Sequence, residues 1–287
     1  MLIDLQLHST YSDGSLTPTQ LAGLMYKNNV KVASLTDHNT VAGQEEFKHA
    51  CKKYNIKTVL GLEVYVKMGT THLNLLWYNY NQNSPELHKI LRESQIRRKA
   101  MVRKMLNKLV DKGFKIEVEK IIDKYTHYIP LNMIVDDVYN IPFNRRKIHK
   151  ELKNSDPRLE EIMGEYFFNK KIGILRESYT DIKRIVALKK KVGGQLIFNH
   201  PGKHNKYAGK TPDKLKKLGI DGIEVLTPHH SLGAVMYSQY LAKHNNWIET
   251  GGSDFHRFEG DRYRLQDSWQ WFKIDSQYLK GVQKIIG

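Results

Sequence analysis

The sequence has a single cysteine, Cys51, and no uninterrupted apolar run long enough to span a bilayer. One cysteine excludes an intramolecular disulfide. The opening residues "MLIDLQLHS" have neither the basic start nor the long apolar stretch of a signal peptide. We therefore expect a cytoplasmic protein without a membrane anchor, and nothing indicates an obligate protein partner.

The sequence also lacks a phosphate-binding P-loop, the glycine fingerprint of dinucleotide-binding folds and the nucleophile elbow of serine hydrolases. The pairs Gly193-Gly194 and Gly251-Gly252 are too isolated to cradle a phosphate. No internal repeat or low-complexity tract is present. These absences direct attention to the polar residues at the ends of the predicted strands.

Acidic residues are few relative to basic ones: 30 Asp and Glu oppose 46 Lys and Arg, so the formal net charge is +16. Such an excess favours anionic partners, phosphates or nucleic acid among them. A composition rich in Lys, Asn and Ile explains the same excess, so charge alone does not choose. Its distribution says more, since between Lys89 and Lys104 seven basic side chains are opposed only by Glu93.

Strand-like and helix-like segments alternate at both ends of the chain. The runs "LIDLQL", "KVASLT", "IKTVLGLEVYV" and "THLNLLWYNY" predict strands, and residues 15–29 and 40–55 predict helices. A long helix from Pro85 to Gly113, followed by further helices, interrupts this alternation. We therefore predict an α/β domain with a parallel sheet or barrel, formed by residues 1–83 and 186–287, and a mainly helical insertion of residues 84–185.

Residues of the kinds that bind metals recur at the ends of the predicted strands. They are His8, Asp13, Asp37, His38, Glu63, His72, His200, Asp254 and His256. In an α/β barrel these ends share one face, so the side chains are expected to converge. A lone His at a strand end is more often a surface residue, but chance does not explain several strand ends at once. Imidazole and carboxylate groups suit Zn²⁺, Mn²⁺ or Fe²⁺.

The runs "DLQLHSTYSDGSLTPTQL", "SLTDHNTVAG", "GLEV", "THLNLL", "NHPG" and "GSDFH" resemble the PHP (polymerase and histidinol phosphatase) superfamily over essentially the whole chain. The resemblance implies a distorted (β/α)7 TIM-like barrel with a helical insertion. It also implies two or three divalent metal ions, with Mn²⁺ favoured and Zn²⁺ or Fe²⁺ as alternatives. The implied ligand sets are His8, Glu63 and Asp254 for one ion, Glu63, His72 and His200 for a second, and Asp13, His38 and His256 for a third.

Gln6 departs from the family pattern. The opening His-x-His pair of the family is Gln-x-His here, so Gln6 occupies the first His position and is a doubtful ligand. An amide oxygen is a poorer ligand than imidazole for late transition metals. Weak binding at the first site, a preference for Mn²⁺, Mg²⁺ or Fe²⁺, and an empty first site all remain open.

The resembling subgroup contains 3′,5′-nucleoside bisphosphate phosphatases and 5′–3′ exoribonucleases. The implied function is a metal-dependent phosphoesterase in which a hydroxide bridging two ions attacks a phosphate of a nucleotide or an RNA 5′ end. The expected catalytic residues are Glu63, Asp37, His200 and His256.

Basic groups near the cluster are expected to hold the substrate phosphate. The candidates are Arg97 and Arg98 on the basic helix, Lys203 and His204 after His200, His230 at another strand end, and Arg257 after "SDFH". Arginine suits bidentate phosphate recognition. For Arg97 and Arg98, a solvated helix face is the alternative.

Two other functions are considered. One is a small-metabolite phosphatase, such as a histidinol-phosphate phosphatase, which the superfamily permits and the basic insertion disfavours. The other is a non-catalytic protein in which Gln6 marks a degenerate first metal site. The other eight ligand positions are retained, which argues against the second.

Overall fold

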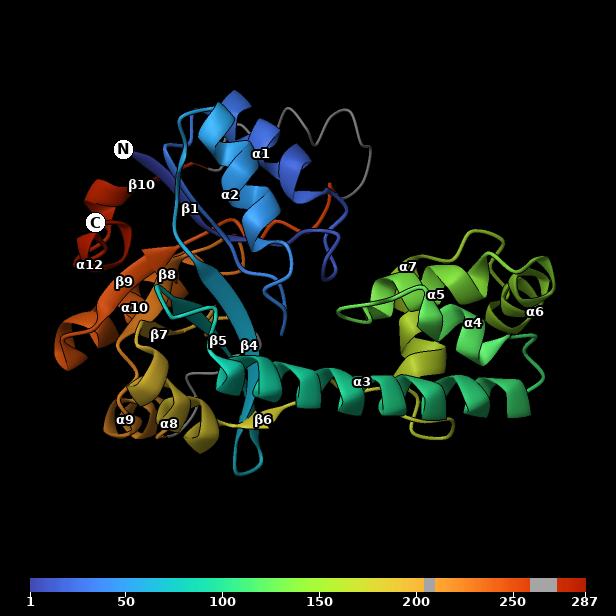
Figure 1. The fold of residues 1–287 in the computed structure, drawn as a ribbon. Coiled ribbons are helices and arrows are strands. Elements are labelled where there is room, and N and C mark those ends of the chain that lie inside the picture. The colour runs from blue at the N-terminus through green and yellow to red at the C-terminus, as the bar shows by residue number, and fades with distance from the viewer. Residues whose placement is uncertain (204–209, 259–272) are drawn as a thin grey trace. The chain divides into compact units, whose positions relative to one another are not determined.

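In the computed structural model, which describes residues 1–203, 210–258 and 273–287, the chain folds into two compact units (Figure 1). Unit 1 consists of Met1–Ile90 together with Tyr179–Gly287, and unit 2 is the intervening segment Leu91–Ser178. Unit 2 begins and ends several residues inside the predicted insertion. Unit 1 is thus assembled from two separate stretches of chain.

The described residues of unit 1 form two sheets. The first has the strand order β10-β1-β2-β3 and the second has the order β6-β4-β5-β7-β8-β9. The strands are β1 (Leu2–Leu7), β2 (Val32–Leu35), β3 (Lys57–Thr58), β4 (Gly61–Met68), β5 (Thr71–Tyr78), β6 (Thr180–Asp181), β7 (Gln195–Phe198), β8 (Gly222–Leu226), β9 (Ile248–Gly251) and β10 (Ile274–Asp275). Pairing is parallel from β1 through β3 and from β7 through β9, so the predicted α/β fold with parallel sheets is confirmed.

The hairpin of β4 and β5 interrupts this parallel order. The two strands pair antiparallel along their full length, and β5 also pairs antiparallel with β7. Two isolated parallel bridges connect the sheets, one between Leu7 and Phe255 and one between His38 and Glu63. The paired strands therefore form two open sheets that are linked at two points.

The helices of unit 1 include the two that were predicted over residues 15–29 and 40–55. They are α1 (Pro18–Lys27), α2 (Gln44–Lys53), α8 (Ile182–Val192), α9 (Thr211–Leu218), α10 (Leu232–Asn245) and α12 (Gln283–Ile286), with a 3₁₀ turn η3 (Ser276–Tyr278). Thr17 caps α1 through a capping box with Gln20, and Pro18 occupies the first turn. The α1 and α2 helices lie side by side (Figure 1), and their apolar faces pack around Leu21, Met25 and Phe47.

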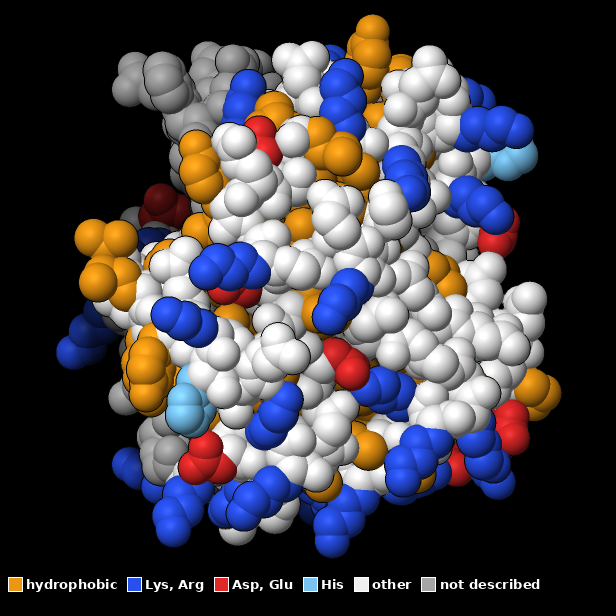
Figure 2. Space-filling view, turned by 90° about the vertical axis from the view of Figure 1, so that its left-hand side faces the viewer, with side chains coloured by type: hydrophobic (Ala, Val, Ile, Leu, Met, Phe, Trp, Pro, Cys, Tyr) orange, Lys and Arg blue, Asp and Glu red, His pale blue; other side chains and the backbone are white. Residues whose placement is uncertain are grey.

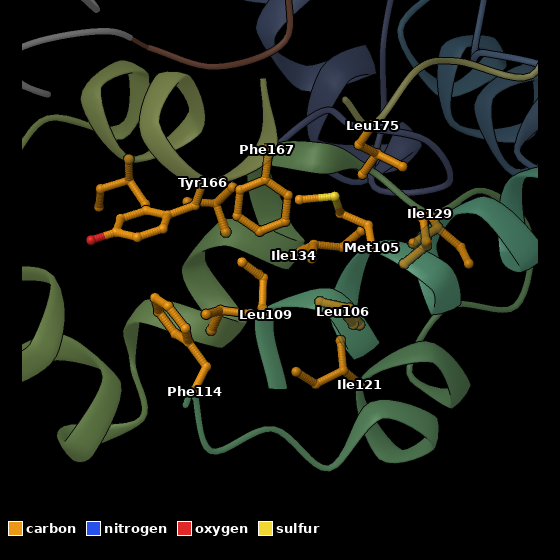
Figure 3. Packing of buried hydrophobic residues seen from close by; sticks show 14 of the residues in the cluster. Met105, Leu106, Leu109, Phe114, Ile121, Ile129, Ile134, Tyr166, Phe167 and Leu175 are labelled. Carbon is orange, nitrogen blue, oxygen red and sulfur yellow. The ribbon is translucent and has the colours of Figure 1, made fainter. Parts of the chain in front are cut away.

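Unit 2 has its own hydrophobic core. Its helices are the C-terminal part of α3 (Pro85–Asp111), α4 (Val118–Asp123), α5 (Leu131–Tyr139), α6 (Pro142–Leu152), α7 (Leu159–Ile162) and the π-helix η1 (Met163–Phe167). Figure 3 shows Met105, Leu106 and Leu109 of α3 packed with Phe114 and Phe167. These residues form an apolar stripe along α3, and that side of the helix packs into this core.

Basic side chains are spread over the surface in one view. Figure 2 shows Lys and Arg separated by hydrophobic and polar groups, without a single large patch on that face. Among the described residues, no helix combines the length and apolar character that crossing a bilayer requires.

Candidate metal centre and phosphate site

A polar cavity of about 280 Å³ lies in unit 1, where several strands end. Its lining consists of Asp13, His38, Tyr65, His72, Asn74, Tyr179, Phe198, Asn199, His200, Lys203, Asp254 and His256. The remaining predicted ligands, His8 and Glu63, are fully buried and contact these residues. Apart from Asp37, the strand-end side chains named from the sequence are thus brought together.

The innermost group consists of His8, Glu63 and Asp254. The His8 Nε2 atom lies 3.1 Å from both Glu63 Oε2 and Asp254 Oδ1. His8 follows β1, Glu63 belongs to β4 and Asp254 follows β9, so three strands position the group. These ligand atoms are close enough together to share one ion.

Asp13 is the centre of a second group. Its Oδ1 lies 3.3 Å from His256 Nε2, and its Oδ2 lies 3.4 Å from His38 Nε2. His8 joins this group through Nδ1, 3.7 Å from Asp13 Oδ1, and its ring stacks on that of His256 with centroids 4.1 Å apart. His8 therefore belongs to both groups. His38 and His256 also approach the innermost carboxylates, with His38 Nδ1 3.8 Å from Glu63 Oε2 and His256 Nδ1 3.7 Å from Asp254 Oδ1.

The other oxygen of Glu63 faces a looser arrangement. The His200 Nε2 atom lies 3.6 Å from Glu63 Oε1, and Asn74 donates a 2.6 Å hydrogen bond to the same oxygen. His72 lines the cavity, but its ring stacks on Tyr179 with centroids 4.0 Å apart. Of the set implied for the second ion, Glu63 and His200 lie together, and His72 lies at the cavity wall.

The spacing and chemistry of these donors fit divalent ions. Within the two tight groups, imidazole nitrogens lie 3.1 to 3.7 Å from carboxylate oxygens, and all ligand atoms of a group lie within 4.8 Å of one another. Ligands bonded at about 2.1 Å to one ion stand roughly 3.0–3.4 Å apart in octahedral or tetrahedral geometry. Imidazole nitrogens and carboxylate oxygens also match the donor preference of Mn²⁺, Fe²⁺ and Zn²⁺.

The charges in the site stabilise one another. Burial alone raises the pKa of a carboxyl, but His38 and His200 beside Glu63 hold its pKa well below the usual range. His256 and His229 act in the same way on the pKa of Asp254. These carboxylates therefore stay ionised, the state that a metal ligand requires.

Gln6 is buried at the centre of the innermost group. Its Nε2 donates hydrogen bonds to Glu63 Oε2 at 3.1 Å and to Asp254 Oδ1 at 2.8 Å. Its Oε1 is also buried and has no hydrogen-bond partner among the residues that the structure describes. The amide thus places a donor, rather than an acceptor, toward the two carboxylates.

Asp37 does not reach the cavity. Its carboxylate accepts hydrogen bonds from the Ser9 amide at 2.7 Å, the Ser9 hydroxyl at 2.6 Å and the Ser12 hydroxyl at 2.5 Å. Burial raises its pKa, and these bonds only partly oppose the rise. Its place is therefore under the loop after β1, which it holds in position, and the expected catalytic role is corrected to a structural one.

The two neighbouring histidines of the sequence "LTPHHS" contact different parts of the site. His229, which the sequence reasoning passed over, places Nε2 at 2.7 Å from Asp254 Oδ2. His230, predicted to bind phosphate, donates from Nδ1 to the Val225 carbonyl and accepts at Nε2 from the Gly202 amide at 3.0 Å. His230 therefore supports the loop after β7 instead of facing the substrate.

The contact of this loop with His230 requires a glycine at position 202. A Cβ atom at this position would lie 2.6 Å from Cδ2 of His230. The loop carries His200, whose φ of 22° is unusual for a residue with a side chain, and Lys203. The contact between Gly202 and the His230 ring therefore fixes this strained loop in place.

Lys203 brings a positive charge to the cavity. Its Nζ lies 3.2 Å from Asp254 Oδ2 and 3.4 Å from His229 Nε2. Burial disfavours its charge, but Asp254 and Glu63 outweigh burial and raise the pKa of Lys203. The ammonium group is therefore charged at the cavity wall, as expected for a phosphate-binding group.

Of the other predicted phosphate-binding residues, Arg97 and Arg98 belong to unit 2. Arg98 is 1% exposed, and its guanidinium donates to the Ile129 and Arg176 carbonyls and pairs with Glu177 at 3.1 Å inside unit 2. Arg97 donates to Ser178 Oγ. Arg98 is thus corrected to a structural residue. Arg257 is half-buried after His256, and His204 lies outside the described residues.

Two buried acids beneath the site were not foreseen. The Glu224 carboxylate accepts a 3.1 Å hydrogen bond from the His200 amide, and burial raises its pKa well above the usual range. Asp4 accepts from the Ser253 amide, and burial raises the pKa of Asp4 to about 6. Both residues lie on strands that were predicted from apolar runs. A charged residue inside such a strand could have indicated a buried acid.

Comparison with known proteins gives consistent matches. A family model described as "PHP domain" matches residues 4–166. The chain is 25% identical over 258 residues to a 5′-3′ exoribonuclease of Haemophilus influenzae, covering 88% of this chain and 89% of that protein. It is 24% identical to a 3′,5′-nucleoside bisphosphate phosphatase of Chromobacterium violaceum, covering 88% and 87%.

Two further matches extend the comparison. A phosphoribosyl 1,2-cyclic phosphate 1,2-diphosphodiesterase of Eggerthella lenta is 26% identical over 265 residues, covering 89% of this chain and 94% of that protein. A solved structure of an amidohydrolase from Chromobacterium violaceum has a TM-score of 0.72 and 22% identity, covering 93% of this chain and 96% of that one. At that identity the structural match speaks for the fold alone.

Proposed function

This chain belongs to the PHP domain family and is a metal-dependent phosphoester hydrolase, and we propose that it releases phosphate from 3′,5′-nucleoside bisphosphates or cleaves nucleotides from RNA 5′ ends. The relatives that carry these activities by name match nearly the whole chain. The non-catalytic alternative is thereby set aside.

One observation carries the proposal. Most of the candidate metal ligands converge on one polar cavity, into which Lys203 also projects. These ligands are His8, Asp13, His38, Glu63, His200, Asp254 and His256. A phosphate monoester or diester needs such a combination of metal ligands and a fixed cation. Site residues that serve only the fold would not place so many ionised groups around an open cavity.

We propose that divalent ions, Mn²⁺ in the first instance, are held by the groups centred on Glu63 and Asp13. Gln6 removes one imidazole from the first group, which favours an ion that accepts oxygen ligands. When bound, such ions supply charge that stabilises the phosphate oxygens and a nucleophile formed from water.

The chain itself supplies binding and orientation. The Lys203 ammonium group is charged and can donate to a phosphate oxygen that enters the cavity. Asn74 and Gln6 each donate to one oxygen of Glu63, so the carboxylate cannot rotate freely. His229 donates to Asp254 in the same way. His200 and His256 are the candidates to transfer a proton to the leaving oxygen, because both line the cavity.

We also propose that unit 1 is the distorted barrel expected of the family and that unit 2 is its helical insertion. The two isolated bridges, Leu7 with Phe255 and His38 with Glu63, support the barrel, because they join the two sheets at candidate metal ligands or directly beside them. The helices of unit 2 and its separate core support the insertion.

A substrate panel tests the proposed reaction. The protein is stripped of metal, reconstituted with Mn²⁺, and assayed for phosphate or nucleotide release. The substrates are adenosine 3′,5′-bisphosphate, a 5′-phosphorylated oligoribonucleotide and histidinol phosphate. Turnover of either of the first two in preference to the third is expected. Exclusive turnover of histidinol phosphate would establish the small-metabolite alternative instead.

A cyclic phosphodiester is a second candidate substrate. The relative from Eggerthella lenta is 26% identical and is matched over 94% of its length. A cavity of about 280 Å³ is also compatible with one ribose phosphate. A ribose 1,2-cyclic phosphate therefore belongs in the same panel, and turnover of it alone would replace the nucleotide assignment.

A further inference from the structure

A second cavity lies within unit 2 and shares no residue with the metal centre. Its volume is about 560 Å³, and its lining consists of Gly113, Phe143, Arg146, Lys147, Lys150 and Glu151. Five of these residues belong to α6, and Gly113 follows α3. On a helix, positions 143, 146, 147 and 150 lie along one side, so α6 presents an aromatic ring and three basic groups to the same groove.

The groove is held together by buried hydrogen bonds. Asn144 is fully buried, accepts from the Lys115 amide at 2.8 Å and donates to the Lys115 carbonyl at 2.9 Å. This fixes the segment after α3 against the start of α6. The Lys115 ammonium group then lies 4.5 Å from the centroid of the Phe143 ring. Ring and ammonium group are thus presented together at the edge of the groove.

Charge in the groove is only partly compensated. Lys147 pairs with Glu151 at 2.6 Å. Arg146 and Lys150 are exposed, and in the described part of the chain no acidic side chain pairs with either of them. Unit 2 as a whole has 20 Lys and Arg against 13 Asp and Glu. A basic groove that contains an exposed aromatic ring is therefore available to a ligand.

We propose that this groove binds single-stranded RNA, with phosphates on Arg146 and Lys150 and a base stacked on Phe143. Phe143 is 38% exposed, so part of its ring is open to stacking. Basic grooves with aromatic rings are the usual means of binding single strands without reading their sequence. The choice of RNA over other polyanions rests on the proposed function. A groove of this kind favours a polynucleotide over a mononucleotide as the substrate of the protein.

Binding is measured by fluorescence anisotropy with a labelled oligoribonucleotide of about 12 nucleotides, within the usual range of single-strand sites. Excess chelator keeps the strand intact. The double variant Arg146→Ala with Lys150→Ala is expected to bind about tenfold more weakly than wild type. Its slope of log affinity against log salt should be smaller by about 1.4, because two phosphate contacts are lost.

The matched control is the double variant Lys170→Ala with Lys171→Ala, which removes the same charge from exposed positions of unit 2 outside the groove. It should retain wild-type affinity. Phe143→Ala should weaken binding about fivefold or more, with an unchanged salt slope, because stacking does not release counterions. Thermal unfolding of each variant checks that the fold is retained.

Equal losses in the groove and control variants would overturn the proposal, because the effect would then be net charge. A protein that binds anionic vesicles as tightly as RNA, with the same loss in the groove variants, would also overturn the RNA assignment. Failure here is separable from failure of the proposed function. Release of phosphate from adenosine 3′,5′-bisphosphate should be equal in wild type and in all three variants, whether or not RNA binds.

Discussion

Gln6 Nε2 donates a hydrogen bond to Asp254 Oδ1, 2.8 Å away. The same nitrogen donates to Glu63, so one neutral amide holds two carboxylates that an ion would otherwise hold. An ion entering the group must compete with this amide or turn its oxygen inward. Affinity for the first ion is therefore set partly by a residue that departs from the family pattern.

Replacing Gln6 with histidine should increase metal affinity. The imidazole offers a nitrogen lone pair and no longer competes for both carboxylates, so we expect affinity for the first ion to rise about tenfold. Calorimetric titration of metal-free protein with Mn²⁺ measures this. The exposed replacement Gln277→His is the control. If both variants bind the same number of ions with the same affinity, Gln6 does not belong to the metal site.

Replacing Glu63 with glutamine should disable the centre. Both oxygens of Glu63 face imidazoles, so the change removes a negative charge from two groups of ligands. We expect at least about a hundredfold loss of phosphate release and a loss of bound metal. Activity and metal content are measured together, against the exposed control Glu160→Gln. Near-normal activity in Glu63→Gln would place the chemistry elsewhere.

His230 should act through the loop that it supports. With His230→Ala, Gly202 loses its hydrogen-bond acceptor, and His200 and Lys203 lose their fixed position. We expect kcat/KM to fall about tenfold or more. Gly202→Ala should have a similar effect, because its Cβ would overlap the ring. Steady-state kinetics are compared with those of the surface variant His244→Ala. An unchanged kcat/KM would mean that the loop keeps its shape without the ring.

Arg98 should contribute to stability and not to catalysis. Arg98→Ala leaves the carboxylate of Glu177 and the carbonyls of Ile129 and Arg176 without the guanidinium. We expect the free energy of unfolding of unit 2 to fall by about 3 kcal/mol. Arg97→Ala, one position away and only half-buried, should cost far less. Urea unfolding of both variants measures the difference, and equal values would show that burial of Arg98 is not stabilising.

Asp4 should make stability depend on pH. Its folded pKa of about 6 lies above the usual value near 3.9, so the protonated carboxyl contributes to the stability of the folded state. This stabilisation is complete below the usual value and is lost as pH rises through 6. Asp4→Asn removes this dependence. Relative to wild type, the metal-free variant should gain on the order of 2 kcal/mol between pH 4 and pH 8. Urea unfolding across that range tests it, with Asp213→Asn as the exposed control.

The convergence of the candidate metal ligands was predictable because strand ends converge. His8, His38 and Asp254 each follow a predicted strand, and parallel strands bring such positions to one face. The roles of His229 and His230 could not be distinguished in this way, because the side chains of adjacent turn residues differ only in the direction in which they point. That direction depends on Gly202, which lies far away in the sequence.

Other errors had signals that were available. Arg98 lies seven residues after Leu91 and seven before Met105, on the apolar stripe of α3, which predicts burial. Asp37 was assigned by its neighbour His38, although successive side chains of an extended segment point in opposite directions. The two open sheets, by contrast, depend on the antiparallel insertion of β5, which alternation of strands and helices does not reveal.

The position of unit 2 in the chain has a consequence for synthesis on the ribosome. Asn79 and Gln195, bonded through their side chains at the end of the β5–β7 pair, are 116 positions apart. The outer edge of β5 therefore stays unpaired until unit 2 has emerged. Because unit 2 has its own core, it can fold first and bring its two ends together, which lowers the entropy cost of closing the loop. A variant that slows folding of unit 2 would leave β5 open to aggregation, even though it changes no residue of the metal centre.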